Sequence, residues 1–282
     1  MHGSSATVRC AVGLLLFTSP PGARIGRAQV TVRATAYEVG DAVSDVGYVW
    51  GSPLRADRPN WAVAGLSAPG FATPLPIDRH VDQWVVTHQS AAVFDVLAPF
   101  REQGPLTSLV TARRLVPISA ALVLGGVVSG RRGLREAGWG CAAALAASNT
   151  VRYAVYAVVA RPRPSEDRGD QYGFRVPGGD WNERSFFAGH ATNAFACTSF
   201  WNERFDLGAG EPVLYATAAL IALSRIADRR HWTSDTFAGV VVGTAVGRAL
   251  AMRYAHRASV RDARRSAELR PAPIVILWRS AF

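Results

Sequence analysis

The pattern of apolar and polar residues changes near Pro105. Before this point prolines interrupt the apolar stretches, so we expect residues 37–104 to be irregular. After it, runs rich in Ala, Val, Leu and Gly recur with a helical period and are separated by polar connections. These runs predict five helices, at 106–129, 134–160, 187–203, 212–228 and 232–256. The expected fold is therefore all-α, a helical bundle that follows an irregular N-terminal region.

Two of the predicted helices come close to the length of a membrane span, which needs about 20 mostly apolar residues. Their apolar runs lie at 115–130 and 236–252, whereas Arg152 interrupts a third run at 139–159. A buried soluble bundle would carry similar runs, and the mean hydropathy of the chain is only +0.09. We expect a membrane-embedded bundle and keep a soluble periplasmic protein as the alternative.

The ends of the predicted helices differ in charge. Arginines cluster in the loop 131–136 and in the segment 253–265, which the positive-inside rule places in the cytoplasm if the helices span a membrane. The long polar loops would then face the periplasm or the exterior of a bacterial inner membrane. An apolar run at 10–17, followed by Ser-Pro-Pro-Gly, has the outline of a secretory signal.

The chain thus divides into four parts. They are a signal or N-terminal anchor segment, an irregular region, a helical domain, and a basic and then apolar tail, at 1–36, 37–104, 105–256 and 257–282.

The basic residues are of one kind. All 31 lysine or arginine positions are arginine, and the formal net charge is +10. Guanidinium is planar and always charged, and it binds phosphate with two hydrogen bonds. The arginines are scattered and no aromatic-basic module accompanies them, so we expect no nucleic-acid partner.

The three cysteines, Cys10, Cys141 and Cys197, lie far apart in the sequence. Their spacing matches neither a disulfide framework nor a set of metal ligands. We expect them to be packing residues and predict no metal site.

The stretch 224–235, SRIADRRHWTSD, places four polar residues beside an apolar run. Ser224 and Arg225 end one predicted helix, while His231 and Asp235 stand four apart at the start of the next. At that spacing the carboxylate can hold one ring nitrogen of the histidine and leave the other as a nucleophile. The stretch therefore indicates a site that handles an anion.

Two further stretches supply matching groups. The helix at 134–160 ends in paired Arg-Pro steps that carry Arg161 and Arg163. In the stretch 183–196, Gly189 is followed by His190 at the start of a helix. Such a helix start offers unpaired amides and a positive dipole end to an anion.

Together these stretches resemble the signature of the type 2 phosphatidic acid phosphatase (PAP2) family and of its relatives, the vanadium haloperoxidases. That signature reads K-x6-R-P, P-S-G-H and S-R-x5-H-x3-D, in this order. Here the third part is complete, the second survives as Phe187-Ala188-Gly189-His190, and the first survives as Arg163-Pro164. The resemblance covers roughly residues 106–252.

The sequence departs from the family pattern at two positions. Tyr156 stands where the family has lysine, and Ala188 stands where it has serine. Arg152 lies one helical turn before Tyr156. Either its longer side chain reaches the phosphate in place of the lysine, or it is a charge that faces the cytoplasm. Loss of the serine removes one hydroxyl donor to a phosphate oxygen.

The resemblance implies a mechanism. His231 would attack phosphorus to form a phosphohistidine, Asp235 would hold its ring, and His190 would act as general acid and then as general base. Phosphate oxygens would be bound by Arg163, Arg225, Gly189, Ser224 and Arg152. The scheme needs no cofactor and no metal, and vanadate is expected to inhibit as a phosphate mimic.

The sequence therefore predicts a metal-independent phosphatase, which hydrolyses a phosphate or pyrophosphate ester, in particular a lipid phosphate. One alternative is a vanadium-dependent haloperoxidase, and another is a non-catalytic membrane scaffold or binding protein that retains the PAP2 fold. We expect His80, His88 and His256 to be core residues. Aromatic side chains in the connection 165–182, at Tyr172, Phe174 and Trp181, would either contact the substrate or anchor the loop at the membrane interface.

Overall fold

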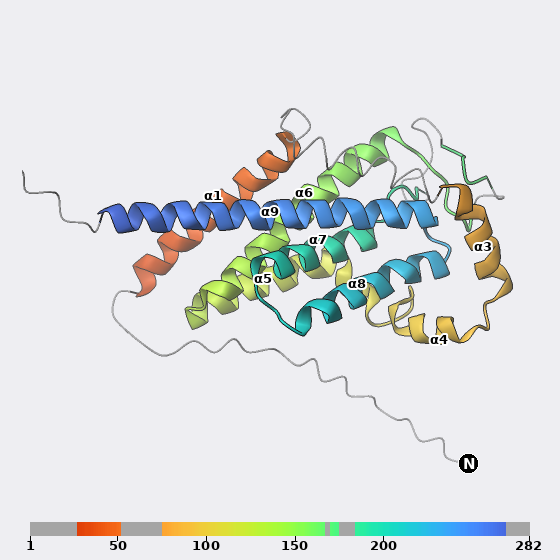
Figure 1. The fold of residues 1–282 in the computed structure, drawn as a ribbon, viewed down its shortest axis with the longest axis horizontal. Helices are drawn as coiled ribbons and strands as arrows, with labels where there is room; N and C mark the ends of the chain where they lie inside the picture. The colour runs from red at the N-terminus through yellow and green to blue at the C-terminus, as the bar shows by residue number, and fades with distance from the viewer. Residues whose placement is uncertain (1–26, 52–74, 167–169, 175–183, 269–282) are drawn as a thin grey trace, which may run out of the picture.

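The fold was analysed in a computed structural model of the chain, which describes residues 27–51, 75–166, 170–174 and 184–268 (Figure 1). Within these ranges the regular structure is helical, apart from an isolated bridge between Pro162 and Arg184. The longer helices are α1 (Arg27–Gly51), α5 (Ala112–Ser129), α6 (Arg132–Val158), α7 (Gly189–Arg204), α8 (Gly210–Ala227) and α9 (Thr233–Glu268). The shorter ones are α3 (Asp78–Thr87) and α4 (Ala92–Leu97), with 3-10 turns at Leu75–Ile77, Ala98–Phe100 and Thr107–Val110.

The all-α prediction is confirmed, and each of the five predicted helices corresponds to one of α5 to α9. The observed helix ends differ by a few residues from the predicted ends, for reasons of local backbone geometry. α5 ends at Ser129 because Gly130 adopts a left-handed conformation with φ of 69°. α9 continues beyond the predicted end at His256 to Glu268.

The N-terminal region is more regular than predicted. Residues 37–104 were expected to be irregular, but they contain the end of α1 together with α3 and α4. The two prolines of this region that the structure describes lie at helix boundaries: Pro76 is in the turn before α3, and Pro99 is in the turn after α4. The predicted signal segment lies mostly outside the described residues, as does the tail after Glu268.

α1 is fixed to the bundle by buried charge. It packs against α6 and α9. The carboxylate of Asp45 on α1 is 2% exposed, and it accepts a hydrogen bond from Arg253 Nε of α9 at 2.7 Å. Arg257, one turn further along α9, pairs with the same carboxylate.

α7 lies in the middle of the bundle, in contact with α6, α8 and α9 (Figure 1). Glycines on α9 allow its close approach to α7. A β-carbon added to Gly239 would lie 2.6 Å from the carbonyl oxygen of Ala188, which directly precedes α7. This packing brings the start of α9 to the N-terminus of α7, where two of the signature segments meet.

A disulfide joins α6 to α7. It links Cys141 to Cys197, whose α-carbons are 4.7 Å apart. The prediction that these two residues serve only in packing is therefore wrong, while Cys10 lies outside the described residues. The spacing of 56 positions gave no indication of the bond, because only the packing of the two helices brings the residues together.

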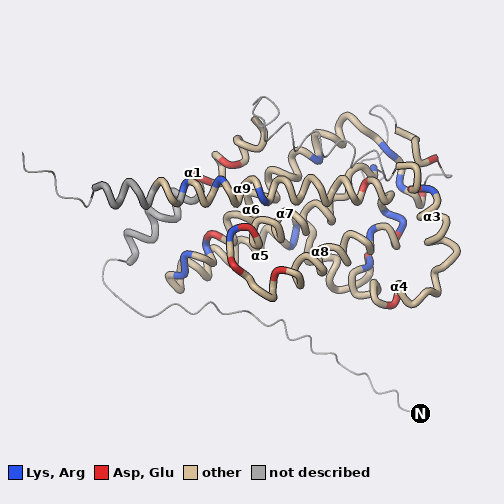
Figure 2. The backbone as a smooth tube through the Cα atoms, viewed as in Figure 1, with Lys and Arg blue, Asp and Glu red and all other residues tan. Residues whose placement is uncertain are grey.

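Two helical segments within the described ranges are long and apolar enough to cross a membrane. They are Ala112–Ser129 and Thr233–Arg257, which match the two runs singled out in the sequence. Length and composition alone also fit core helices, and half of the second segment is buried inside the bundle. Charged residues gather at the end of the bundle near α3 and again around the junction of α5 and α6 (Figure 2).

Candidate active site

The three signature segments meet at the end of the bundle where α9 begins. Ser185 N donates to the carbonyl of Arg161 at 2.8 Å, which places the stretch before α7 alongside the stretch after α6. Ala188 N donates to the carbonyl of Asp235 at 3.0 Å, which joins the same stretch to the start of α9. Residues from α6, α7 and the α8–α9 connection therefore share one site.

His231 is buried, and one side of its ring is held by the backbone. Its Nδ1 atom lies 2.6 Å from the carbonyl oxygen of Ser185. Because a carbonyl can only accept, Nδ1 carries the proton and the lone pair of the neutral ring is on Nε2. Burial and the charge of Arg225 lower the pKa of His231 well below 6.5. The ring is thus a neutral base whose Nε2 can act as a nucleophile.

Asp235 has other partners than the one expected from its spacing. Its carboxylate accepts from Arg161 Nη1 at 2.5 Å and from the backbone nitrogen of Trp232 at 2.9 Å. The difference arises because α9 begins at Thr233, so His231 precedes the helix and the four-residue spacing is not a helical one. Asp235 thus fixes the loop around His231, and the Ser185 carbonyl orients the ring.

Three arginines surround the histidines. Arg152 comes from α6, Arg163 from the segment after it, and Arg225 from the end of α8. In the part of the chain that the structure describes, the buried Nε atom of each lacks a hydrogen-bond partner. Four further arginines share this feature, and what distinguishes Arg152, Arg163 and Arg225 is that all three charges act on His190. Three guanidinium groups gathered in this way fit a bound anion.

His190 lies in the field of these arginines. It is the second residue of α7, and its pKa is lowered from 6.5 to about 3 by burial and then by the charges of Arg225, Arg152 and Arg163. The free protein therefore holds His190 in its neutral form. An anion placed among the same arginines would restore the affinity of the ring for a proton.

Gly189 and Ser224 differ in what they offer. Gly189 is buried at the first position of α7, and the Arg152 guanidinium lies directly beside it. The hydroxyl of Ser224 is also buried, but it donates to the carbonyl of Ile221 at 2.7 Å within α8. The hydroxyl proton is thus donated within α8, whereas the sequence predicted that Ser224 would donate it to a phosphate oxygen.

Residues of the N-terminal region also reach the site, and the sequence reasoning missed them. Asp78 pairs with Arg161 at 2.7 Å, and Asp82 pairs with Arg229 at 2.7 Å. These carboxylates lie on α3, more than 80 positions before their partners, and no motif marks them.

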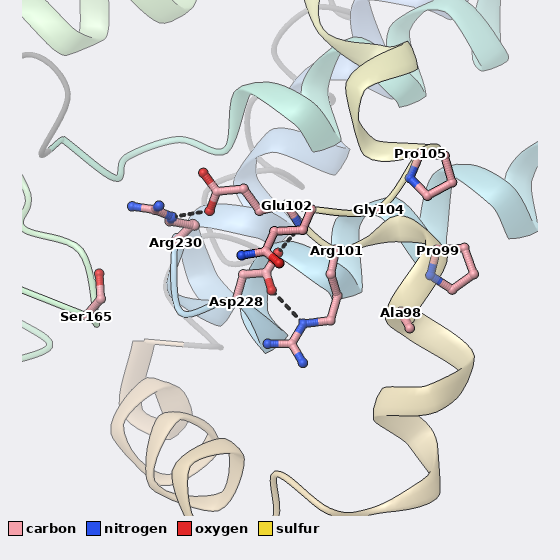
Figure 3. A pocket seen from close by; sticks show the side chains of 10 residues that line it. Ala98, Pro99, Arg101, Glu102, Gly104, Pro105, Ser165, Asp228 and Arg230 are labelled. Atoms are coloured by element: carbon pink, nitrogen blue, oxygen red, sulfur yellow. Dashed lines mark hydrogen bonds and ion pairs between the residues drawn. The ribbon is translucent and has the colours of Figure 1, made fainter. Parts of the chain in front are cut away.

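A cavity of about 1140 Å³ adjoins the site (Figure 3). It lies between residues 98–105 and the connection from α8 to α9. Glu102 pairs with Arg230 at 2.6 Å, and Arg101 pairs with Asp228 at 2.7 Å, both within its lining. The positive charges of Arg225 and Arg163 also act on Glu102, so this cavity lies close to the anion-binding arginines.

The remaining predicted residues lie at the surface or outside the described ranges. Tyr172 and Phe174 are exposed, and the Phe174 ring centroid is 4.8 Å from the guanidinium carbon of Arg161. Trp181 lies outside the described residues. His80, His88 and His256 are exposed, so the prediction that they are core residues is wrong.

Residues 137–258 match the model of the PAP2 superfamily. This part of the chain belongs to the PAP2 superfamily. The match confirms the resemblance based on the three motifs, and it runs from α6 into α9. The regions that hold α1, α3 and α4 precede this PAP2 segment.

A shorter similarity links the chain to a lipid A phosphatase. Over 67 residues the chain is 36% identical to a lipid A 1-phosphatase of Porphyromonas gingivalis. The aligned part covers 22% of this chain and 15% of that protein, so the chain spans a small part of its relative. No solved structure matches the chain.

Proposed function

We propose that this PAP2 protein is a phosphatase that hydrolyses a lipid phosphate through a phosphohistidine at His231. The observation that carries the proposal is the convergence of a neutral histidine, with its Nε2 lone pair available, and three arginines whose charges all act on His190. A phosphate group has the charge and the acceptor oxygens that such a set can bind. The PAP2 match and the similarity to a lipid A 1-phosphatase support the same reaction class.

The first step is displacement at phosphorus. Nε2 of His231 donates its lone pair to phosphorus, and the bond from phosphorus to the leaving oxygen breaks. The leaving alkoxide takes a proton from His190, which lies at the start of α7. Arg225 and Arg163 stabilise the negative charge that spreads over the equatorial oxygens.

The second step regenerates the enzyme. His190, now neutral, takes a proton from a water molecule whose oxygen attacks phosphorus and displaces Nε2 of His231. Inorganic phosphate is released. Three guanidinium groups supply the positive charge for both steps, so the proposed reaction needs no cofactor and no metal ion.

Arg152 takes the place of the family lysine in this scheme. Tyr156 occupies the lysine position, and the guanidinium carbon of Arg152 lies 5.2 Å from the centroid of its ring. The Arg152 charge acts on His190 directly. Arg152 is therefore assigned to a phosphate oxygen near the N-terminus of α7.

The proposed location is the bacterial inner membrane, with the site facing the periplasm or exterior. Two candidate spans support the membrane location. The disulfide between Cys141 and Cys197 supports a location of the helical bundle in an oxidising compartment such as the periplasm. A substrate with its tail in the bilayer would then present its phosphate to the end of the bundle.

Phosphate release from a panel of lipid phosphates tests the proposal. Purified protein is incubated with phosphatidic acid, phosphatidylglycerol phosphate and undecaprenyl pyrophosphate, and released phosphate is measured with malachite green. We expect release that vanadate inhibits, that EDTA leaves unchanged, and that His231→Ala abolishes. The exposed His256 provides the matched control, since His256→Ala should retain full turnover.

Two outcomes contradict the proposal. Wild-type turnover in His231→Ala would remove the nucleophile from the mechanism. Bromide oxidation after addition of vanadate, without phosphate release from any lipid, would instead favour a haloperoxidase.

A further inference from the structure

Asp78 lies outside the PAP2 segment, yet its carboxylate is buried within the scaffold of the site. It is the first residue of α3, and its side chain and that of Arg161 are both 0% exposed. Oδ2 accepts from Arg161 Nη2 at 2.7 Å, and Oδ1 accepts from the backbone nitrogen of Ser234 at 2.8 Å. The Ser234 hydroxyl also bonds to Oδ2, at 2.5 Å.

Arg161 bridges two carboxylates from distant parts of the chain. Its Nη1 donates to Asp235 at 2.5 Å and to the Ser234 hydroxyl at 2.8 Å, while Nη2 faces Asp78. A buried charge of this kind is stable only with partners close by. Removal of Asp78 would therefore leave Arg161 with one carboxylate and free the first turn of α9 on one side.

The same arginine is connected to the nucleophile. The carbonyl of Arg161 accepts from Ser185 N at 2.8 Å, and the carbonyl of Ser185 in turn lies 2.6 Å from His231 Nδ1. On the other side, Ser234 and Asp235 lie in the first turn of α9, just after His231. Arg161 therefore holds both Ser185, whose carbonyl contacts the His231 ring, and the start of α9, which follows His231.

α3 holds neighbouring segments as well. Asp82 accepts two hydrogen bonds from Arg229, at 2.7 and 2.9 Å, two residues before the nucleophile. Arg79 N donates to the side chain of Gln171 at 2.8 Å, and the Gln171 carbonyl accepts from Arg161 Nη2 at 2.5 Å. α3 lies at the end of the bundle where α9 begins (Figure 1).

We propose that Asp78 is a positioning residue for the reaction, acting through Arg161 and Ser234 to set the direction of His231 Nε2. The inference rests on the proposed function and adds to it an element that precedes the PAP2 segment. Asp78 does not touch the anion-binding arginines in the contacts described, so its role is in the attack and not in capture of the phosphate.

Rapid-quench measurement of phosphoenzyme formation separates positioning from folding. The full chain is mixed with the ³²P-labelled lipid phosphate that is hydrolysed fastest in the panel, and is quenched with alkali, in which phosphohistidine survives. For Asp78→Asn we expect the rate constant at saturating substrate to fall roughly tenfold to a hundredfold, as for a misplaced reacting group. KM and the inhibition constant for phosphate should change less than about threefold, because the arginines remain.

Asp95→Asn is the matched control, since Asp95 is an exposed aspartate on the neighbouring helix α4. It removes the same charge and should leave the rate constant unchanged. The rate constant does not depend on the fraction of folded protein, whereas the amplitude does. A lower amplitude with an unchanged rate constant in Asp78→Asn would show a purely structural role and overturn the inference.

A milder variant keeps the test decisive if Asp78→Asn does not fold. Ser234→Ala removes one hydroxyl that bonds both Asp78 and Arg161, and we expect a smaller decrease in the same rate constant. An unchanged rate constant in Ser234→Ala would count against positioning through this network. Absence of any phosphoenzyme in the unmodified protein would instead contradict the proposed function itself.

Discussion

The guanidinium group of Arg152 lies against the α-carbon of Gly189, where an added β-carbon would come within 2.5 Å of Nη1. A side chain at this position would therefore displace the end of the flexible Arg152 side chain, although the backbone angle of Gly189 is ordinary. The contact brings a cation from α6 to the first turn of α7, where backbone amides are unpaired. The contact supports the proposed role of Arg152 in place of the family's lysine.

Gly189→Ala should displace Arg152 and weaken binding of phosphate. We expect KM and the inhibition constant for phosphate to rise about tenfold, the effect of losing one charge-assisted hydrogen bond. Arg152→Ala should have a similar effect on both constants. Steady-state kinetics with phosphate as inhibitor measure both.

A second glycine at a helix start provides the control. Gly210 is the first residue of α8, and an added β-carbon would meet Leu207 at an ordinary 3.7 Å. Gly210→Ala should leave both constants unchanged. If Gly189→Ala bound phosphate as tightly as the unmodified protein, the proposal that Arg152 binds a phosphate oxygen would be wrong.

The pKa of His190 predicts a loss of stability in mild acid. It is about 3 in the folded protein because of burial and the nearby arginines, against 6.5 for an ordinary histidine. Between these values the unfolded chain binds more protons at His190 than the folded protein does. The contribution of His190 to stability is therefore complete above pH 6.5 and is lost as the pH falls toward 3. The contribution of His190 to the free energy of unfolding should decrease by on the order of 1–2 kcal/mol between pH 6.5 and 5.

Thermal or denaturant unfolding across this pH range measures the effect. His190→Gln should give a shallower decrease, while His256→Gln, at an exposed site, should leave the slope as it is. An identical slope in His190→Gln would mean that another group titrates.

Anion binding should be coupled to proton uptake by the same residue. A dianion among the arginines favours the protonated form of His190 and raises its pKa by up to a few units. Sulfate is a suitable probe because it does not itself titrate between pH 5 and 8. We expect a fraction of a proton to be taken up per sulfate at pH 5 and none at pH 8.

Isothermal titration calorimetry in buffers of different ionisation enthalpy detects this uptake. At pH 5 the binding heat should depend on the buffer, and in His190→Gln this dependence should disappear. Equal heats in all buffers at pH 5 would show that His190 stays neutral beside an anion, and the general acid would have to be another group.

The sequence was sufficient to predict the helices of the bundle and the segments that form the site. Long apolar runs define α5 to α9, and the spacing from Ser224 to Asp235 matches the third part of the PAP2 signature. Both features depend on residues that are close together in the sequence, so they can be predicted from it.

The remaining features depend on contacts between distant residues. The bonding partner of Asp235 depends on α9 starting at Thr233, two residues later than His231, which shifts the aspartate away from the expected helical pairing. The ion pair between Asp82 and Arg229 joins positions 147 apart, and no local sequence pattern predicts such a pair. α1 was missed because its attachment to the bundle depends on the pairing of Asp45 with Arg253, which lies 208 positions further along the chain.

The disulfide between Cys141 and Cys197 should contribute to stability more than to catalysis. It closes a loop of 56 positions between α6 and α7, and the loss of such a constraint on the unfolded chain costs about 2–4 kcal/mol. Dithiothreitol should therefore lower the unfolding temperature, while kcat measured below the transition changes little, because glycine-mediated packing against α9 still holds the start of α7. The double variant Cys141→Ala and Cys197→Ala should unfold at a reduced temperature with or without the reductant. Mass spectrometry after alkylation in denaturant checks the bond directly, and alkylation of both residues without prior reduction would show that they are free thiols.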